Sequence, residues 1–134
     1  MAGGTEVLVH ADADDVAEAV AARLMARLVE IQRDFRVPQI ALTGGRIASR
    51  AYQRLASEGA RSAVDWSQVE LWWGDERFVP AGSEDRNDTS TLEVLTANLQ
   101  LDAKRVHPMP ASGGDLDLDG AAAAYAAELA GTTF

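Results

Sequence analysis

Short strand-like segments, rich in β-formers, apolar or with a two-residue period, alternate along this chain with segments that have the period of a helix. This alternation limits the fold more than any other feature. The strand-like segments are residues 5–10, 40–43 and 69–73, with an extended piece at 106–110. Strands that alternate with helices predict a parallel sheet with helices on its faces, which is the α/β class.

The segments between these strands place apolar residues three and four positions apart, as on one face of a helix. The expected faces are Val16, Val20, Leu24, Leu28 and Ile31, then Ile47, Ala51 and Leu55, then Leu92, Leu95 and Leu99, and last Tyr125 and Leu129. The expected N-caps are Asp12 or Asp14 for the first helix, Asn87, Asp88 or Thr89 for the third, and Asp119 for the last.

The length of 134 residues suits one domain with its own core, so we expect a single α/β domain over residues 1–134. The final helix is followed only by Gly131-Thr132-Thr133-Phe134. A pattern of strands and helices that stops there predicts a further strand, and the sheet is expected to be truncated without it. An open sheet edge of this kind favours self-association.

Composition excludes several classes of site and partner. The chain has no cysteine, so disulfides and thiolate metal sites are excluded. Its 12 basic and 21 acidic residues give a formal charge of −9, which repels nucleic acid and anionic membranes. No apolar run approaches the ~20 residues that cross a bilayer, and we expect no secretory signal. We expect a cytoplasmic protein in which an anionic substrate needs a local cluster of arginines.

Two turns at the expected carboxyl ends of strands carry most of the candidate binding residues, because open parallel sheets bind ligands at that edge. The first turn is Thr43-Gly44-Gly45-Arg46. Paired glycines let the backbone approach an anion, the next helix directs N–H groups at it, and Arg46 adds a positive charge. Alternatively, the glycines only form a tight turn and Arg46 is solvated, which is the interpretation that the glycines alone favour. Dinucleotide-binding and P-loop patterns are absent.

The second turn follows the strand at 69–73 and contains two carboxylates and an arginine after Gly74. Arg77 could hold a substrate phosphate or polarise a carbonyl, and Asp75 could position water. A local ion pair in a surface loop explains the same residues. Further along, Arg86 could be a second phosphate ligand, or it could pair with Asp85.

Four short motifs, in their order and spacing, resemble those of the 6-phosphogluconolactonase family. The motifs are Thr-Gly-Gly after an apolar strand, Trp-Gly-Asp-Glu-Arg-Phe-Val-Pro at 73–80, Asp-Arg-Asn at 85–87 and Val-His-Pro-Met at 106–109. The resemblance implies a modified Rossmann-like sheet, akin to glucosamine-6-phosphate deaminase, and the N-terminal portion of a sugar-phosphate lactonase-like domain. It also implies hydrolysis of 6-phospho-D-glucono-1,5-lactone to 6-phosphogluconate in the pentose phosphate pathway, without metal or cofactor.

Carried over by position, the resemblance gives a set of predicted site residues. Asp75 and Arg77 are predicted to be catalytic, and the predicted substrate- or phosphate-binding residues are Thr43, Gly44, Gly45, Arg46 and Arg86.

Two departures from the family pattern stand beside this prediction. Arg46-Ile47-Ala48 follows Gly-Gly, where the family has Ser, Thr, Gly or Asn. The later Gly-Pro-Asp-Gly-His-type segment that carries the family's catalytic histidine is absent, so activity of this chain alone is in doubt. His10 and His107 are expected to bond to nearby backbone, and neither is assigned as the base.

Two alternatives remain open. A sugar-phosphate isomerase or deaminase would use Asp75 to abstract a carbon-bound proton, but the Gly-Asp-Glu-Arg-Phe-Val-Pro run favours the lactonase. A non-catalytic sugar-phosphate-binding domain is compatible with the absent histidine segment.

Overall fold

The computed structural model describes residues 3–134 and confirms an α/β fold with a parallel sheet. Strands β1 (Gln39–Leu42) and β2 (Glu70–Trp73) are parallel, in a register that pairs Gln39 with Glu70 and Leu42 with Trp73. A single parallel bridge between Leu71 and Val106 continues the sheet beyond β2. Both strands therefore end at the same edge of the sheet.

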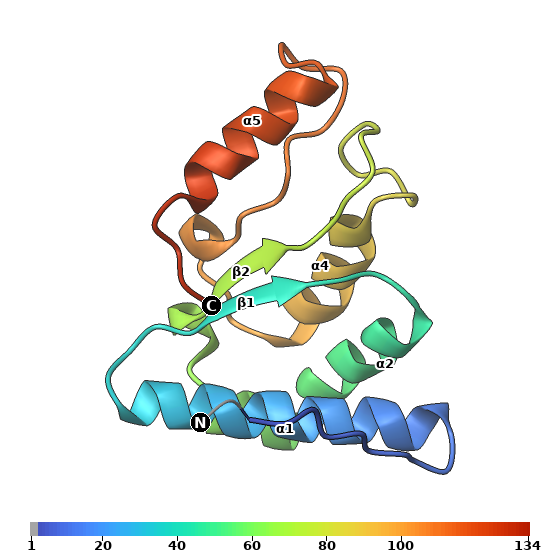
Figure 1. The fold of residues 1–134 in the computed structure, drawn as a ribbon, viewed down its shortest axis with the longest axis vertical. Helices are drawn as coiled ribbons and strands as arrows, with labels where there is room; N and C mark the ends of the chain where they lie inside the picture. Colours follow the sequence, from blue (N-terminus) through green and yellow to red (C-terminus); the bar gives the residue numbers. More distant parts are fainter. Residues whose placement is uncertain (1–2) are drawn as a thin grey trace.

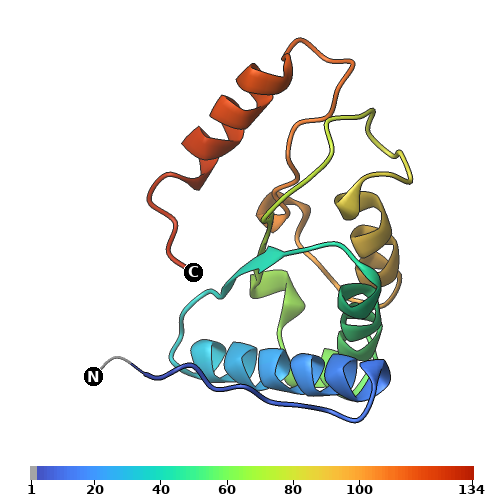
Figure 2. The same ribbon diagram turned by 45° about the vertical axis from the view of Figure 1, so that its right-hand side comes forward.

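Within residues 3–134 the helices are α1 (Ala13–Arg33), α2 (Arg46–Leu55), α3 (Glu58–Ala63), α4 (Asn87–Asn98) and α5 (Leu118–Leu129). Two 3-10 turns, η1 (Trp66–Gln68) and η2 (Ala103–Arg105), precede β2 and the bridge at Val106. Figures 1 and 2 show α1 and α2 on one side of the sheet and α5 on the other. This arrangement confirms the prediction of helices on both faces.

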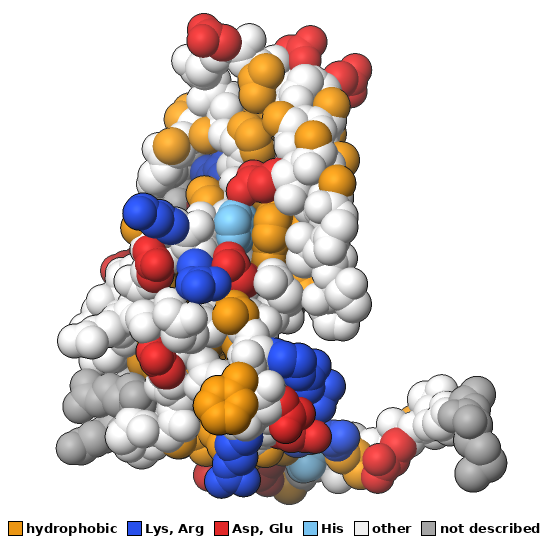
Figure 3. All heavy atoms as spheres, turned by 90° about the vertical axis from the view of Figure 1, so that its left-hand side faces the viewer, with side chains coloured by type: hydrophobic (Ala, Val, Ile, Leu, Met, Phe, Trp, Pro, Cys, Tyr) orange, Lys and Arg blue, Asp and Glu red, His pale blue; other side chains and the backbone are white. Residues whose placement is uncertain are grey.

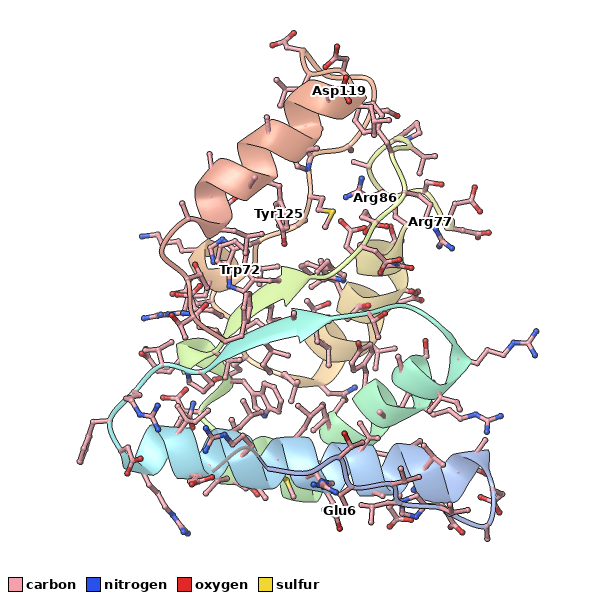
Figure 4. The ribbon with its side chains drawn as sticks, in the orientation of Figure 1. Glu6, Trp72, Arg77, Arg86, Asp119 and Tyr125 are labelled. Atoms are coloured by element: carbon pink, nitrogen blue, oxygen red, sulfur yellow. The ribbon has the colours of Figure 1, made fainter. Side chains whose placement is uncertain are left out.

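The predicted alternation in β2 separates two faces of the sheet. Leu71 and Trp73 are buried in the main core with Leu42, Leu55 and Leu95. Burial of each large apolar side chain of this kind stabilises the fold by about 1.5–3 kcal/mol. Trp72 points to the opposite face and meets Tyr125 of α5, with ring centroids 5.8 Å apart. Figure 4 shows these two side chains between β2 and α5.

The predicted strand at residues 5–10 is wrong. The segment is extended but belongs to no sheet within residues 3–134, and it runs along α1 in Figures 1 and 2. Val7 and Val9 are 78% and 89% exposed. Residues of high strand propensity form a strand only when a neighbouring strand accepts and donates their backbone hydrogen bonds, and no described strand lies beside these.

The expected helical faces are confirmed only in part. In α1 the fully buried residues are Ala17, Ala21 and Leu28, whereas Val20 is 41% exposed. Small alanines therefore allow α1 to pack closely on its neighbours. On the predicted face of α2, Ile47 is exposed. Tyr52, which was not part of the predicted face, is buried.

The predicted caps also hold in part. Asp12 caps α1, as expected, by accepting a hydrogen bond from the Asp15 amide at 2.9 Å. Helix α5 is capped by Asp117, which accepts from the Gly120 amide at 2.8 Å, so the expectation for Asp119 is wrong. Asp119 lies in the first turn, where its charge suits the helix dipole. The cap of α4 comes from a distant residue, described below.

No helix within residues 3–134 is both long and apolar enough to cross a membrane. The face of the molecule seen in Figure 3 carries acidic and basic side chains close together, and hydrophobic side chains gather at the height of α5. Leu116 and Leu118, at the start of α5, are exposed.

Candidate functional site

The two turns predicted to bind a ligand lie next to each other. Because β1 and β2 are parallel neighbours, the chain leaves both strands at one edge of the sheet, and the Gly74 amide donates to the Leu42 carbonyl at 2.9 Å. The first turn then enters α2, and the second enters the loop before α4. Figure 1 shows both connections on the same side of the molecule.

The first turn leaves the N-terminus of α2 without a side-chain cap. Its N-cap is Gly45, which has φ 106° and ψ 163°, a conformation that glycine adopts far more easily than other residues. No acidic residue lies in the first turn of α2. Arg46 is exposed and pairs with no described carboxylate. The N–H groups of this helix start, with the positive end of its dipole, therefore remain available to an anion.

The backbone of Thr43 is held by hydrogen bonds to the buried Tyr52 side chain. Its backbone N–H donates to the Tyr52 hydroxyl at 3.0 Å, and that hydroxyl donates to the Thr43 carbonyl at 2.7 Å. Burial raises the pKa of Tyr52, although the hydrogen bond with Thr43 acts in the opposite direction, so the hydroxyl stays protonated. The Thr43 amide is thus occupied, although the residue as a whole is exposed.

Three consecutive residues of the second turn have different environments. Asp75 and Arg77 are exposed, whereas the Glu76 side chain is only 2% exposed. Glu76 accepts hydrogen bonds from the backbone amides of Asn87 at 2.6 Å and Asp88 at 2.9 Å. These are the first two residues of α4, so the distant Glu76 carboxylate caps this helix. The expectation that Asn87, Asp88 or Thr89 supplies the cap is wrong.

Among the described residues, only Nη1 of the Arg77 guanidinium has hydrogen-bond partners. Its Nη1 donates to the Asp85 carbonyl at 3.2 Å and to Asn87 Oδ1 at 3.3 Å. No described residue accepts a hydrogen bond from its Nε or Nη2, which keeps two donors free for a bidentate anion. Figure 4 shows Arg77 and Arg86 on the same loop, beside the start of α4.

Arg86 is buried, with 2% of its surface exposed. Its guanidinium donates to both oxygens of Asp88 at 2.9 Å and to the Met109 carbonyl at 2.7 Å. The hydrogen bond to Asp88 raises the pKa of Arg86 further, against the effect of burial. These contacts favour the ion-pair alternative for Arg86, with Asp88 rather than Asp85 as the partner. Direct contact between Arg86 and phosphate stays a prediction.

Sequence reasoning missed two residues that organise this edge, Glu76 and Asn87. The Asn87 amide donates to the Asp75 carbonyl at 3.1 Å and accepts from Arg77, and it also presses against Gly44, where any side chain would collide with it. The density of polar residues around each turn was the one feature of the sequence that could have pointed to them. The capping of α4 by Glu76 could not be predicted, because the two lie 11 residues apart in the sequence.

A cavity of about 450 Å³ lies between the second turn and α5. Asp75, Glu76 and Arg77 line it, but most of its surface is apolar and comes from residues such as Phe78, Met109, Leu118 and Leu129. None of the first-turn residues lines this cavity. Its apolar walls do not suit a phosphate, so we place the phosphate at the strand ends and not in the cavity.

Neither histidine side chain has a hydrogen bond to a described residue of the two turns. His10 is exposed in the extended N-terminal segment. The His107 ring is bound by Glu70 and Glu128, at 2.6 Å each, and stacks on Trp72 with centroids 3.9 Å apart. Burial alone lowers the pKa of His107, but the bonds to the two glutamates outweigh it and raise the pKa. The ring therefore binds side chains, and not the nearby backbone that we expected.

Comparison with known proteins gives one consistent result. The family model for glucosamine-6-phosphate isomerases/6-phosphogluconolactonase matches residues 11–133. The chain is 46% identical over 132 residues to a 6-phosphogluconolactonase of Streptomyces coelicolor, an alignment that covers 97% of this chain and 51% of that protein.

Solved structures agree with this result. The 6-phosphogluconolactonase of Trypanosoma brucei superposes with a TM-score of 0.73 at 26% identity, over 92% of this chain and 49% of that one. A monomeric glucosamine-6-phosphate deaminase superposes with a TM-score of 0.75 at 14% identity, over 93% and 50%, which shows a shared fold only. The chain spans about half the length of these relatives.

Proposed function

This chain belongs to the glucosamine-6-phosphate isomerase/6-phosphogluconolactonase family, and from that premise we propose that it supplies the phosphate-binding half of a 6-phosphogluconolactonase. The proposed substrate is 6-phospho-D-glucono-1,5-lactone and the product is 6-phosphogluconate, as in the pentose phosphate pathway. The relatives that share 46% and 26% identity both carry the lactonase name.

One observation carries the proposal for this chain: two sources of positive charge meet at one edge of the sheet. The uncapped start of α2 with Arg46 forms one source, and the free Nε and Nη2 of Arg77 form the other. The Asn87 side chain touches both turns and shows that they are neighbours. A phosphate held there neutralises local positive charge in a protein of net charge −9.

In this proposal the chain binds and orients the substrate. Amides at the start of α2, together with Arg46 and Arg77, hold the 6-phosphate and so fix the lactone ring above the strand ends. Asp75, exposed beside Arg77, orients water or the ring hydroxyls. The resemblance assigns activation of water to a histidine in a segment that this sequence does not contain, so no residue described here is given that role.

Attack of water on the lactone carbonyl produces a tetrahedral oxyanion, and the ring then opens to the carboxylic acid. Positive charge and amide donors stabilise an oxyanion of this kind. The donors named at this edge hold the phosphate, so no residue described here is assigned to the oxyanion. A phosphate fixed at the far end of the substrate contributes by holding the reacting carbonyl in place.

The proposal is tested by removing Arg77. We expect Arg77→Ala to weaken binding of 6-phosphogluconate about tenfold or more, because a charge-assisted bidentate contact is lost. Binding of unphosphorylated gluconate should change much less. Isothermal titration of both ligands gives the two dissociation constants.

Arg23→Ala is the matched control, since Arg23 is an exposed arginine on α1. It should leave both dissociation constants unchanged. Equal losses for the phosphorylated and unphosphorylated ligands in Arg77→Ala would show that Arg77 does not contact the phosphate. Release of ammonia from glucosamine 6-phosphate would replace the lactonase proposal with a deaminase.

A further inference from the structure

Asn87 is the one polar side chain described here that contacts both turns of the candidate site. It is the first residue of α4 and is 7% exposed. Its Oδ1 accepts from Arg77 Nη1 at 3.3 Å, and its Nδ2 donates to the Asp75 carbonyl at 3.1 Å and to Asp75 Oδ1 at 3.4 Å. The same amide lies against Gly44, where a side chain would displace it.

Asn87 is itself held rigidly. Its backbone N–H donates to Glu76 Oε1 at 2.6 Å, and the same oxygen accepts from the Arg77 backbone N–H at 2.9 Å. Its carbonyl accepts from the Thr91 hydroxyl at 2.8 Å. The Glu76 carboxylate is buried 3.9 Å from the Arg86 guanidinium, which helps to hold it in place. The start of α4 is thus a fixed support for the amide of Asn87.

An amide suits this position better than other side chains of similar size. It offers an acceptor to the Arg77 guanidinium and donors to the two Asp75 oxygens at the same time. A carboxylate would place a second negative charge beside Asp75 and could not donate, and leucine could do neither. By occupying Nη1, the amide leaves Nε and Nη2 of the guanidinium without a described partner.

We propose that Asn87 is a positioning residue that orients the Arg77 guanidinium and sets its separation from the Gly44 turn, so that one phosphate can contact both. This inference rests on the proposed function, because the ligand is the phosphate of that substrate. Asn87 does not contact the phosphate in this account. It acts through Arg77.

A double-mutant cycle tests the proposal. Asn87→Ala should raise the dissociation constant of 6-phosphogluconate about tenfold in the wild-type background, within the range of coupling energies of contacting residues. In the Arg77→Ala background, Asn87→Ala should change this dissociation constant by less than about twofold, because the group that Asn87 orients is gone. A role confined to folding would give the same loss in both backgrounds, and that result would overturn the proposal.

Two further measurements keep the test decisive. Asn98→Ala, at the exposed end of the same helix, is the matched control and should change neither affinity nor its coupling to Arg77. If Asn87→Ala does not fold, as judged by thermal melting, Asn87→Ser replaces it, because serine keeps a polar side chain at this position but is too short to reach Arg77.

A measurement without ligand separates this inference from the proposed function. NMR relaxation of the Arg77 Nε–H group should show an ordered side chain in the wild-type chain and a mobile one in Asn87→Ala. If the wild-type chain binds no 6-phosphogluconate but this loss of order occurs, the proposed function fails and the positioning role stands. An Arg77 side chain that is equally mobile in both proteins would overturn the positioning role.

Discussion

Adjacent residues of the second turn have different roles, as Asp75, Glu76 and Arg77 show. The outer two are exposed at the strand edge, and the middle one is buried and caps α4. A buried carboxylate is costly unless it is paired and hydrogen-bonded. Glu76 meets that condition through three backbone amides and the nearby Arg86. One residue therefore stabilises the loop that presents the other two.

Position 45 of the candidate site has a backbone conformation that strongly favours glycine. Its φ of 106° with ψ of 163° is strained for any residue with a Cβ, even though the space around it is open. We expect Gly45→Ala to lower the free energy of unfolding by about 1–3 kcal/mol, measured by urea denaturation.

Gly114→Ala provides the comparison for Gly45→Ala. Gly114 is exposed, also has open space, and does not have a positive φ. Its replacement should be neutral or slightly stabilising, by up to about 1 kcal/mol, because alanine has fewer unfolded conformations. Equal destabilisation by both substitutions would contradict the account of the Gly45 conformation.

At the residue scale, the sequence predicted where the polar chemistry gathers but not what each side chain does. Glycines after a strand and charges after the next strand are local patterns, and both turns are found at one sheet edge. Burial of Glu76 and Arg86 depends on how the loop folds back onto α4 and onto Met109. Contacts of that kind are tertiary and leave no periodic pattern in the sequence.

Among the elements, α5 is attached to the sheet by a small polar cluster as well as by apolar packing. Tyr125 accepts from the Trp73 amide at 2.9 Å and donates to the His107 carbonyl at 2.8 Å. The His107 ring joins Glu70 at the sheet to Glu128 on α5. Because α5 forms one wall of the cavity beside the second turn, this cluster also helps to set the width of that cavity.

The His107 cluster predicts a pH dependence of stability. The pKa of His107 is raised in the folded protein, so its stabilising effect is complete below the unfolded pKa of about 6.5 and is lost as the pH rises through the folded value. Urea denaturation at increasing pH should show a loss on the order of 1 kcal/mol, because Glu128 is partly exposed.

His107→Gln should remove this pH dependence. His10→Gln is the matched control, since His10 is exposed, and it should retain the wild-type profile. A wild-type stability that increases over the same pH range would contradict the assigned direction of the pKa shift.

Element by element, the sequence predicted the helices and the two central strands well. The segment at residues 5–10 was not predictable in the same way, because strand propensity is local and strand pairing is not. The short α3 (Glu58–Ala63) also has no apolar periodicity that would predict it.

At the scale of the whole molecule, positive groups gather locally in an acidic protein. The chain has a formal charge of −9, yet the edge formed by the two turns presents Arg46, Arg77 and an uncapped helix start beside the exposed Asp75. Phosphate recognition requires these groups to act on one ligand at the same time. The chain spans about half of its lactonase relatives, so binding, and not turnover, is the property to measure on it directly.

The most direct measurement is an NMR titration of the labelled chain with 6-phosphogluconate, following the backbone amides of both turns. We expect the amides of Gly45 and Arg46 and those around Arg77 to shift together, with one common dissociation constant, and gluconate at equal concentration to shift both sets much less. Shifts confined to one turn, or two different dissociation constants, would contradict a shared phosphate site.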